Sequence, residues 1–355
     1  MKKFEHGGNI YEKRPEGAEW LDFSANINPL GLALSARKAI ESSIEDLVHY
    51  PDPEARELRE AIAGHYNVPL EGVVAGNGAA ELFYLFLQTV RPRRVLLPVP
   101  SFSEYERAAL AARCQISYFQ LNPEEDFRID WADFMGALPV ADCVILGNPN
   151  NPTGSLLTRN ELVRALEMIK NGNQWVVIDE SFLDFLTYDN RYSVRDLAAE
   201  YPRLFVVQSL TKFFALPGLR LGFGVACAEL AKRLNDGKDV WNVNLLAQKA
   251  GAAVLRDREY QKQSRDFIAA EAQHFYQCLA KCPGIRAYQP SVNFILLDVS
   301  ALGLDSTEFA ARMKEKGILV RDCANCSGLD GRSFVRIAVR QRADNEQFLH
   351  ALEDL

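Results

Sequence analysis

The stretch that decides the fold is residues 143–154, CVILGNPNNPTG, in which a short apolar run ends at a loop of asparagines and prolines. Four further short apolar runs, which also end at proline, glycine or a polar residue, lie at 94–97, 175–178, 204–208 and 221–225. Runs of this length are typical of strands buried on both faces. Helical patterns lie between them, for example at 104–112 and 158–170. The alternation predicts an α/β fold with a mostly parallel sheet between helices.

The two ends of the chain have a different pattern from the middle. A helical stretch runs from about residue 256 to 280, and it is followed by a predicted strand at 293–298, a helix at 306–316, strands at 318–321 and 334–339, and a helix from 344. This order is typical of an α+β unit. The first 40 residues show little regular pattern. We therefore predict an N-terminal segment 1–40 that packs on a small α+β domain, 256–355, and a large α/β domain, 41–255.

Composition excludes several classes of protein. The 355 residues are 48% hydrophobic with a formal net charge of −7, as in an ordinary globular enzyme. Basic clusters are short, the longest being at 91–94, so we expect no nucleic-acid partner. Apolar stretches are far shorter than the roughly 20 residues that span a membrane, and residues 1–14 lack the apolar segment of a secretion signal. A cytoplasmic protein that acts on a small molecule is the resulting prediction.

Cysteine usage agrees with a reducing compartment. The seven cysteines are an odd number, and we expect all of them to be reduced thiols. Cys323 and Cys326 have the C-x-x-C spacing of redox and zinc sites, but a lone pair is half a zinc site and no second pair completes it. We therefore predict a loop with two free thiols and no metal ion.

Polar residues at the predicted strand ends are the candidates for chemistry, because ligands of open α/β sheets bind outside the carboxyl ends of the strands. Residues 76–81, GNGAAE, are either a turn with a helix cap or an anion site made by the amides of Ala79 and Ala80. The loop at 148–154 has more polar groups than a turn needs, and we expect its amides to point outward. Asp179 is either a helix cap or a negative charge that faces a bound cation.

Two basic residues complete this set. Lys212, in the sequence SLTK that follows a predicted strand, is a candidate Schiff-base nucleophile, because burial lowers the pKa of a lysine and frees its amine. Its alternative is an ordinary surface charge. Arg220, in PGLRLG, is suited to bind a phosphate through two hydrogen bonds, or else forms a structural ion pair.

The order Asn151, Asp179, Lys212, Arg220 resembles that of the fold-type I pyridoxal-phosphate enzymes, the aspartate aminotransferase superfamily, over essentially the whole chain. The resemblance implies pyridoxal 5'-phosphate as cofactor and Lys212 as the residue that joins it and moves protons. Asp179 would keep the ring nitrogen protonated and Asn151 would bind the ring's 3-oxygen. The cofactor phosphate would be bound by Ala79, Ala80, Ser209 and Arg220, and the ring would stack on Phe102.

The resemblance also implies a homodimer with shared sites. Tyr50, in YPDP, matches a tyrosine that reaches the cofactor phosphate of the neighbouring subunit. Two departures concern the cofactor. Phe182 stands where a tyrosine usually donates to the 3-oxygen, and Ala79 and Ala80 stand where hydroxyl residues are common, so the phosphate depends more on backbone amides and Arg220.

The segments 6–9 (HGGN), 22–31, 210–213, 241–244 and 321–325 resemble the threonine-phosphate decarboxylases of cobalamin biosynthesis. Those enzymes convert L-threonine O-3-phosphate to (R)-1-amino-2-propanol O-2-phosphate and carbon dioxide. The histidinol-phosphate aminotransferases are the alternative. The resemblance implies that Arg336 binds the substrate carboxylate and Arg321 its phosphate, with His6 and Asn26 completing the pocket. We expect the other histidines, His49, His65, His274 and His350, to be structural.

A third possibility is a non-catalytic ligand sensor, because the same fold serves in transcription regulators. Such regulators append a DNA-binding helix-turn-helix, and we expect none here, because the enzyme-like segment begins at once and leaves no spare stretch of roughly 70 residues. The presence of Lys212 also favours an enzyme.

Overall fold

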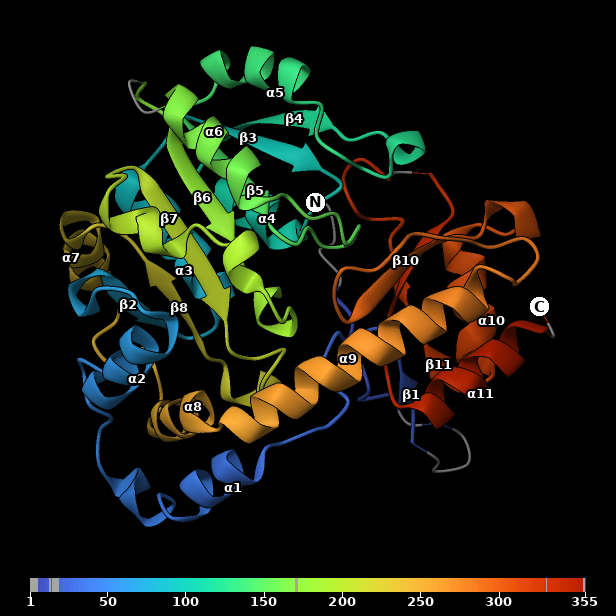
Figure 1. Cartoon of the computed structure of the whole chain (residues 1–355), viewed down its shortest axis with the longest axis horizontal. Coiled ribbons are helices and arrows are strands. Elements are labelled where there is room, and N and C mark those ends of the chain that lie inside the picture. Colours follow the sequence, from blue (N-terminus) through green and yellow to red (C-terminus); the bar gives the residue numbers. More distant parts are fainter. Residues whose placement is uncertain (1–5, 13, 15–18, 170–171, 330, 354) are drawn as a thin grey trace.

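The computed structural model describes residues 6–12, 14, 19–169, 172–329, 331–353 and 355. They form a large α/β unit and a smaller α+β unit, and the long helix α9 (Arg258–Leu279) runs from one unit to the other (Figure 1). Among these residues no helix combines the length and the apolar character that a membrane span requires. All seven cysteines are free thiols, as predicted.

The large unit is built on a seven-stranded sheet of the described residues. Its strands are β2 (Val73–Gly76), β3 (Arg94–Val99), β4 (Gln115–Gln120), β5 (Cys143–Gly147), β6 (Trp175–Asp179), β7 (Leu204–Ser209) and β8 (Gly222–Val225). Their spatial order is β2-β8-β7-β6-β5-β3-β4, and β8 runs antiparallel to both of its neighbours. The other pairs are parallel, which confirms the predicted mostly parallel sheet.

Helices cover both faces of this sheet, so successive side chains of a strand enter different cores. In β5, Cys143 and Ile145 pack with α3 (Ala79–Val90), α4 (Ser103–Ala111) and α7 (Ala228–Gly237). Val144 and Leu146 of the same strand pack in the opposite core, with α2 (Arg56–Tyr66), α5 (Trp131–Ala137), α6 (Arg159–Ile169) and α8 (Leu245–Arg256). Burial on both faces explains why these strands are continuous apolar runs in the sequence.

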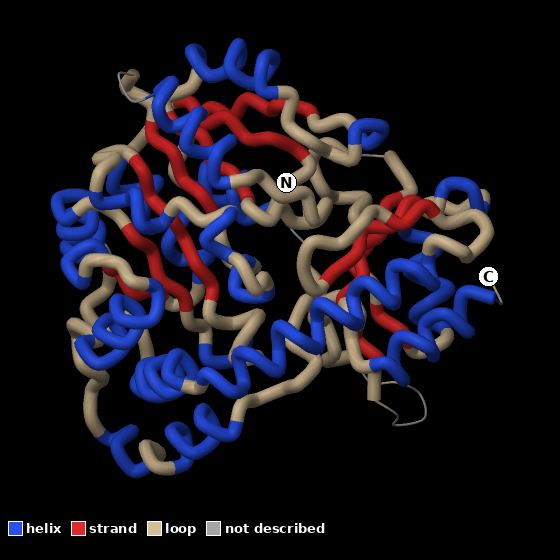
Figure 2. Tube along the Cα trace, viewed as in Figure 1, coloured by secondary structure: helices blue, strands red, loops and turns tan. Residues whose placement is uncertain are grey.

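The smaller unit combines both ends of the chain, as predicted. Its four-stranded antiparallel sheet has the order β12 (Arg321–Asp322), β13 (Phe334–Ala338), β10 (Phe294–Asp298), β9 (Arg286–Ala287). A second pair joins β1 (Leu21–Asp22) to β11 (Ile318–Leu319) in parallel, and α10 (Ser306–Glu315) and α11 (Arg342–Glu353) complete the unit. Figure 2 shows the strands of the two units as separate groups.

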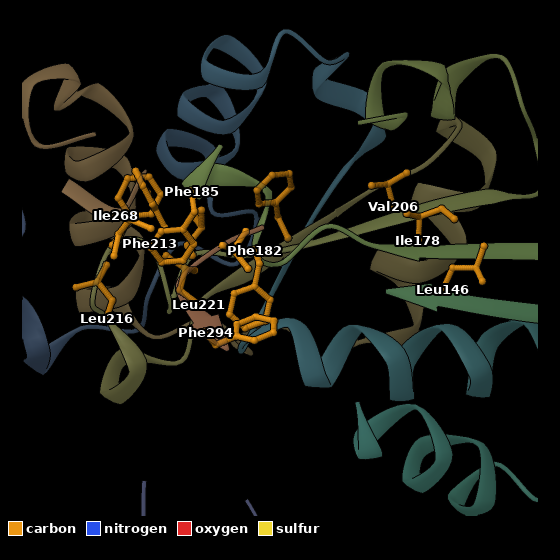
Figure 3. Packing of buried hydrophobic residues seen from close by; sticks show 14 of the residues in the cluster. Leu146, Ile178, Phe182, Phe185, Val206, Phe213, Leu216, Leu221, Ile268 and Phe294 are labelled. Carbon is orange, nitrogen blue, oxygen red and sulfur yellow. The ribbon is translucent and has the colours of Figure 1, made fainter. Parts of the chain in front are cut away.

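A cluster of phenylalanines joins the two units next to the carboxyl ends of the large sheet. Phe182, which follows β6, packs edge-on against Phe294 of the small sheet at 5.0 Å between ring centroids. Phe185 meets Phe213 in the same way at 5.1 Å. Figure 3 shows these rings beside the strand residues Ile178 and Val206. The aromatic packing gives the strand ends a fixed, buried support.

Three expectations differ from the structure. The predicted strand 318–321 breaks into β11 and β12, which belong to different sheets. Helix α1 (Leu34–Glu41) begins inside the segment expected to lack regular structure, and it packs along α8. The edge strand β4 is absent from the prediction because four of its six residues are exposed and its sequence has no apolar alternation. Lys170, the predicted end of α6, lies outside the described residues, and the domain boundaries at 40 and 255 remain predictions.

Candidate active site

A cavity of about 810 Å³ lies at the carboxyl ends of the large sheet. Residues of β12, β13 and the N-terminal segment also line it. It brings together almost all of the predicted site residues, namely His6, Asn26, Ala79, Ala80, Phe102, Asn151, Asp179, Ser209, Lys212, Arg220, Arg321 and Arg336. Tyr50 is the exception. Its side chain is 76% exposed on the surface, where it stacks on Trp241 at 4.2 Å between ring centroids.

Asp179 ends β6 with a buried carboxylate. The hydroxyl of Tyr105 donates to Oδ2 at 2.5 Å, and the backbone N–H of Ser181 donates to Oδ1 at 2.9 Å. Burial raises the pKa of Asp179, while these two donors favour the ionised form. Tyr105 is not among the residues predicted from the sequence, although its position three residues after Phe102, in the first turn of α4, indicates that it faces the same cavity.

Lys212 follows β7, the strand adjacent to β6, so the sheet places it beside Asp179. Its Nζ donates to Thr211 Oγ1 at 3.0 Å. Burial, together with the positive charge of Arg220, lowers the pKa of Lys212 to about 8. This confirms the expected desolvation and leaves an appreciable fraction of neutral amine near neutral pH.

An anion site is built where α3 begins. Gly78 is the N-cap residue, with a φ of +82°, and a Cβ there would lie 2.3 Å from Arg220 Nη2. Glycine therefore lets the guanidinium lie over the helix N-terminus, where the N–H groups of Ala79 and Ala80 have no partner within the helix. The hydroxyls of Ser209 and Thr211 face each other at 2.7 Å nearby.

The amides of the loop 148–154 are mostly bonded to neighbouring segments. Asn148 donates to the backbone oxygens of Leu157 and Tyr192, and Asn150 donates to that of Pro100 and to the hydroxyl of Thr153. These amides were predicted to point outward, but they hold the loop against the segments around it, because buried polar groups need partners. Asn151 differs, since it lines the cavity and its Oδ1 accepts from Arg336 Nη1 at 2.5 Å.

Two arginines lie opposite each other at the other end of the cavity. Arg321 of β12 is in register with Arg336 of β13, and both side chains are buried. Arg336 Nη2 donates to the backbone oxygen of Ser24 at 2.7 Å, and burial lowers the pKa of Arg336 to about 10. Arg321 Nη2 donates to Asn325 Oδ1 at 2.7 Å. Two neighbouring buried guanidinium groups favour an anionic ligand.

The N-terminal segment adds polar groups to this end. His6 contacts the buried carboxylate of Glu104, at 2.7 Å between Nε2 and Oε1. Asn26 is 3% exposed, and neither of its side-chain amide atoms has a hydrogen-bond partner among the described residues. A buried amide without partners is rare and costly, so Asn26 indicates a polar ligand at this position.

The remaining described histidines lie outside the residues that line the cavity, and the neighbour of Asp179 has a structural partner. Among the residues that the structure describes, His6 is the histidine that lines the cavity. His65 Nδ1 lies 2.9 Å from the backbone oxygen of Leu255. Glu180, directly after Asp179, forms a buried ion pair with Arg195 at 3.0 Å. In the pair Asp179-Glu180, one carboxylate therefore faces the cavity and the other supports the fold.

The comparisons with known proteins agree with this geometry. The model of the family named aminotransferase class I and II matches residues 18–352. The chain belongs to this family, whose members depend on pyridoxal phosphate.

Individual relatives are similar over nearly their full length. A protein from Caldanaerobacter subterraneus subsp. tengcongensis, provisionally named a threonine-phosphate decarboxylase, is 40% identical over 100% of this chain and 95% of its own. The threonine-phosphate decarboxylase of Salmonella typhimurium is 35% identical over 99% and 96%. The crystal structure of the histidinol-phosphate aminotransferase from Clostridium acetobutylicum has a TM-score of 0.87 and 33% identity, covering 94% of this chain and 98% of that one.

The cavity fits the family's cofactor. Asp179 presents a buried carboxylate to a cation, Lys212 presents an amine of lowered pKa, and the cradle that Gly78 leaves open at the start of α3 accepts an anion. These three features match a protonated ring nitrogen, an aldehyde carbon and a phosphate group. Phe182 packs against Phe294 and has no hydroxyl, so it cannot donate the hydrogen bond that a tyrosine at this position would give to the ring's 3-oxygen.

Proposed function

We propose that this protein decarboxylates L-threonine O-3-phosphate, with pyridoxal phosphate, to (R)-1-amino-2-propanol O-2-phosphate and carbon dioxide in cobalamin biosynthesis. The observation that carries the proposal is a second anion-binding set in the same cavity as the cofactor cradle. Arg321, His6 and the unpartnered Asn26 line the cavity from the small unit and the N-terminal segment, whereas Ala79 and Arg220 line it from the large unit. One set serves the phosphate of the cofactor and the other serves the phosphate of the substrate.

The residues at the cofactor end have separate roles in this proposal. Bound pyridoxal phosphate supplies a positively charged ring that accepts the electron pair released when a bond to the substrate Cα breaks. Asp179, whose carboxylate accepts hydrogen bonds from Tyr105 and Ser181, would hold the ring nitrogen protonated. Lys212 Nζ, with a pKa of about 8, would deliver the proton that replaces the departing carboxylate at Cα.

The residues at the substrate end select the bond that breaks. These residues would do so by holding the substrate in one rotamer about its N–Cα bond. Charge-assisted hydrogen bonds from Arg321 to the substrate phosphate contribute about 1.5 to 3 kcal/mol each, enough to fix a rotamer. Arg336 keeps a second hydrogen on each terminal nitrogen beyond its bonds to Asn151 and Ser24, so it can still bind the carboxylate.

A histidinol-phosphate aminotransferase is the second candidate, because the similarity to the Clostridium acetobutylicum structure is high. Its substrate also carries a phosphate, so the same arginines serve it. The decarboxylase is favoured by the 35% identity to the Salmonella typhimurium enzyme over almost the whole of both chains.

The test incubates the holoenzyme with L-threonine O-3-phosphate in one sample and with histidinol phosphate plus 2-oxoglutarate in another. Carbon dioxide and the aminopropanol phosphate, identified by mass spectrometry, are expected in the first sample. Unphosphorylated threonine is the control and should be processed at least about 100-fold more slowly, since it forgoes the bonds to Arg321. Transamination of histidinol phosphate without carbon dioxide release from phosphothreonine would establish the alternative.

The proposal includes a cytoplasmic homodimer in which Tyr50 reaches the cofactor phosphate of the neighbouring subunit. Support comes from a group of exposed apolar side chains around Tyr50, comprising Ile44, Leu47, Val48, Val240 and Trp241. Such groups often mark protein interfaces. Mixing Tyr50→Phe subunits with Lys212→Ala subunits should give heterodimers with one intact site. Activity that never exceeds that of the two parents, after subunit exchange is demonstrated, would contradict the shared site.

A further inference from the structure

The C-x-x-C pair lies in the wall of the active-site cavity. Cys323 and Cys326 both line it, although their side chains are almost fully buried. The N–H of Cys326 donates to the backbone oxygen of Cys323 at 2.9 Å, which closes a four-residue turn after β12. The first and last Cα atoms of such a turn lie within about 7 Å of each other. Disulfides span about 4.4 to 6.8 Å between Cα atoms, so the turn can accept one with little movement.

This turn holds the side chain of Arg321. The guanidinium donates to the backbone oxygen of Asp322, to Asn325 Oδ1 at 2.7 Å and to Cys326 Sγ at 3.7 Å. Two of the three acceptors, Asn325 and Cys326, lie within the turn, and the third, Asp322, directly precedes it. A change in the shape of the turn must therefore change where the guanidinium points.

Charge makes Cys326 the reactive member of the pair. The hydrogen bond from Cys323, with the positive charges of Arg321 and Arg336, lowers the pKa of Cys326 to about 7. The hydrogen bond to Cys326 and burial raise the pKa of Cys323 well above its usual value. A thiolate beside a guanidinium and next to a protonated thiol is the arrangement of a redox-active pair.

The other five cysteines have different surroundings. Cys114 and Cys143 pack inside the core beneath α3 and α4, and burial raises the pKa of both. Cys278 and Cys282 lie half-buried at the end of α9, and burial also raises the pKa of Cys282. Cys227 is half-buried next to Pro202. Among the described cysteines, the cavity is lined by Cys323 and Cys326.

We propose that Cys323 and Cys326 are a modification site, which a peroxide oxidises to a disulfide that displaces Arg321 and so weakens binding at the substrate end of the cavity. The Cys326 thiolate attacks one peroxide oxygen, the O–O bond breaks, and the hydroxide that leaves takes a proton to become water. Cys323 then attacks the oxidised sulfur, the S–O bond breaks, and its thiol proton leaves in a second water. Two electrons pass from the two sulfurs to the peroxide, and a dithiol reverses the change.

The consequence for turnover rests on the proposed role of Arg321 in binding the substrate phosphate. The disulfide removes the contact between Cys326 and Arg321 and reshapes the turn, so kcat/KM for L-threonine O-3-phosphate should fall by about tenfold or more. The cofactor end should be unaffected, because the hydrogen bonds described for Asp179, Lys212 and Arg220 involve residues outside this turn.

The experiment treats the holoenzyme with hydrogen peroxide and analyses the tryptic peptide 322–332, which contains Cys323 and Cys326 and no other cysteine. The expected peptide is lighter by two hydrogen atoms, and dithiothreitol restores its mass. Cys323→Ser should abolish this reversible change, whereas Cys278→Ser should retain both the change and the basal activity. A peptide that stays reduced while other cysteines are oxidised would overturn the proposal, as would a disulfide without any loss of turnover.

A second measurement does not depend on activity. Inorganic phosphate, as an anion for Arg321, should neutralise the charge beside Cys326 and slow disulfide formation at least about threefold in the wild type. The same addition should have no effect on Arg321→Ala. Equal slowing in both proteins would show that the thiol pair and Arg321 are not coupled. If the disulfide forms as described and untreated enzyme fails to process phosphothreonine, the proposed function fails and the thiol site stands.

Discussion

The two ends of the active-site cavity are built in different ways. At the cofactor end, Asp179 and Lys212 follow the adjacent strands β6 and β7, and their polar atoms are already bonded to Tyr105, Ser181 and Thr211. At the substrate end, His6, Asn26, Arg321 and Arg336 come from four separate segments. Asn26 and the Nε of Arg336 are buried there without a described partner.

This difference indicates that one end of the site is formed in advance and that the other is completed by its ligand. The cofactor end is fixed by the hydrogen-bond ladder of a buried sheet, so it exists before any ligand binds. The substrate end has unsatisfied polar atoms that a ligand would complete, and its residues depend on the packing of the small unit against the large one. Substitutions at the two ends should therefore have separable effects on chemistry, cofactor binding and substrate binding.

The largest effect is expected for Lys212→Ala. Turnover should fall by about 10⁴-fold or more, because both covalent attachment and proton transfer are lost. The cofactor should still bind non-covalently, since Asp179 and Arg220 remain, and its absorbance in a gel-filtered sample measures this. The matched control is Lys238→Ala, because Lys238 is half-buried and bonds to the backbone oxygen of Ala75. Full activity of Lys212→Ala would refute the assignment.

Substitutions at the adjacent residues Asp179 and Glu180 should affect different properties, catalysis in the first case and stability in the second. Asp179→Asn should lower kcat by about 10³-fold, because the ring nitrogen loses its counter-charge. Glu180→Gln should leave the cofactor spectrum unchanged and lower the free energy of unfolding by about 3 kcal/mol, because the buried Arg195 loses its ion pair with Glu180 and keeps the one with Asp189. Steady-state kinetics and urea denaturation test both variants. A loss of kcat below tenfold in Asp179→Asn would mean that Asp179 acts only as a cap.

Arg321 and Arg220, the arginines proposed to bind the substrate phosphate and the cofactor phosphate, should differ in which affinity their substitution lowers. Arg321→Ala should lower kcat/KM for phosphothreonine by about 100-fold through lost charge-assisted hydrogen bonds, and should change cofactor affinity less than about threefold. Arg220→Ala should instead weaken cofactor binding by about tenfold or more. Kinetics and cofactor titration of both variants test this prediction. Similar losses of cofactor affinity would show that the two ends are not independent.

The smallest effect concerns pH and the cofactor end alone. Burial moves the pKa of Lys212 down from 10.5 to about 8, so the neutral amine should accumulate as pH rises toward 8. The rate at which cofactor-free protein captures pyridoxal phosphate should therefore rise about tenfold per pH unit below 8 and level off above it. Stopped-flow absorbance measures this rate. A midpoint near 10.5 would mean that water reaches the lysine freely.

The sequence by itself determined the cofactor end of the site. Short apolar runs that are buried on both faces have a clear pattern, and in a parallel sheet the residues that follow them must meet at one edge. The positions of Asn151, Asp179, Lys212 and Arg220 therefore followed from local order along the chain. The lowered pKa of Lys212 could be anticipated in the same way, because a lysine in a pocket between apolar strands must lose solvation.

Tertiary structure alone decided which residues form the substrate end and which hydrogen bonds the polar side chains of the site make. No local pattern shows that Tyr105 bonds to Asp179, that His6 meets Glu104 across 98 positions, or that the amides of Asn148 and Asn150 donate to backbone oxygens of Leu157 and Pro100, outside their own loop. The same holds for Arg321 and Arg336, whose pairing depends on a strand that breaks after Leu319 and changes sheets. Contacts between distant segments depend on how the two units pack, and sequence periodicity does not encode that packing.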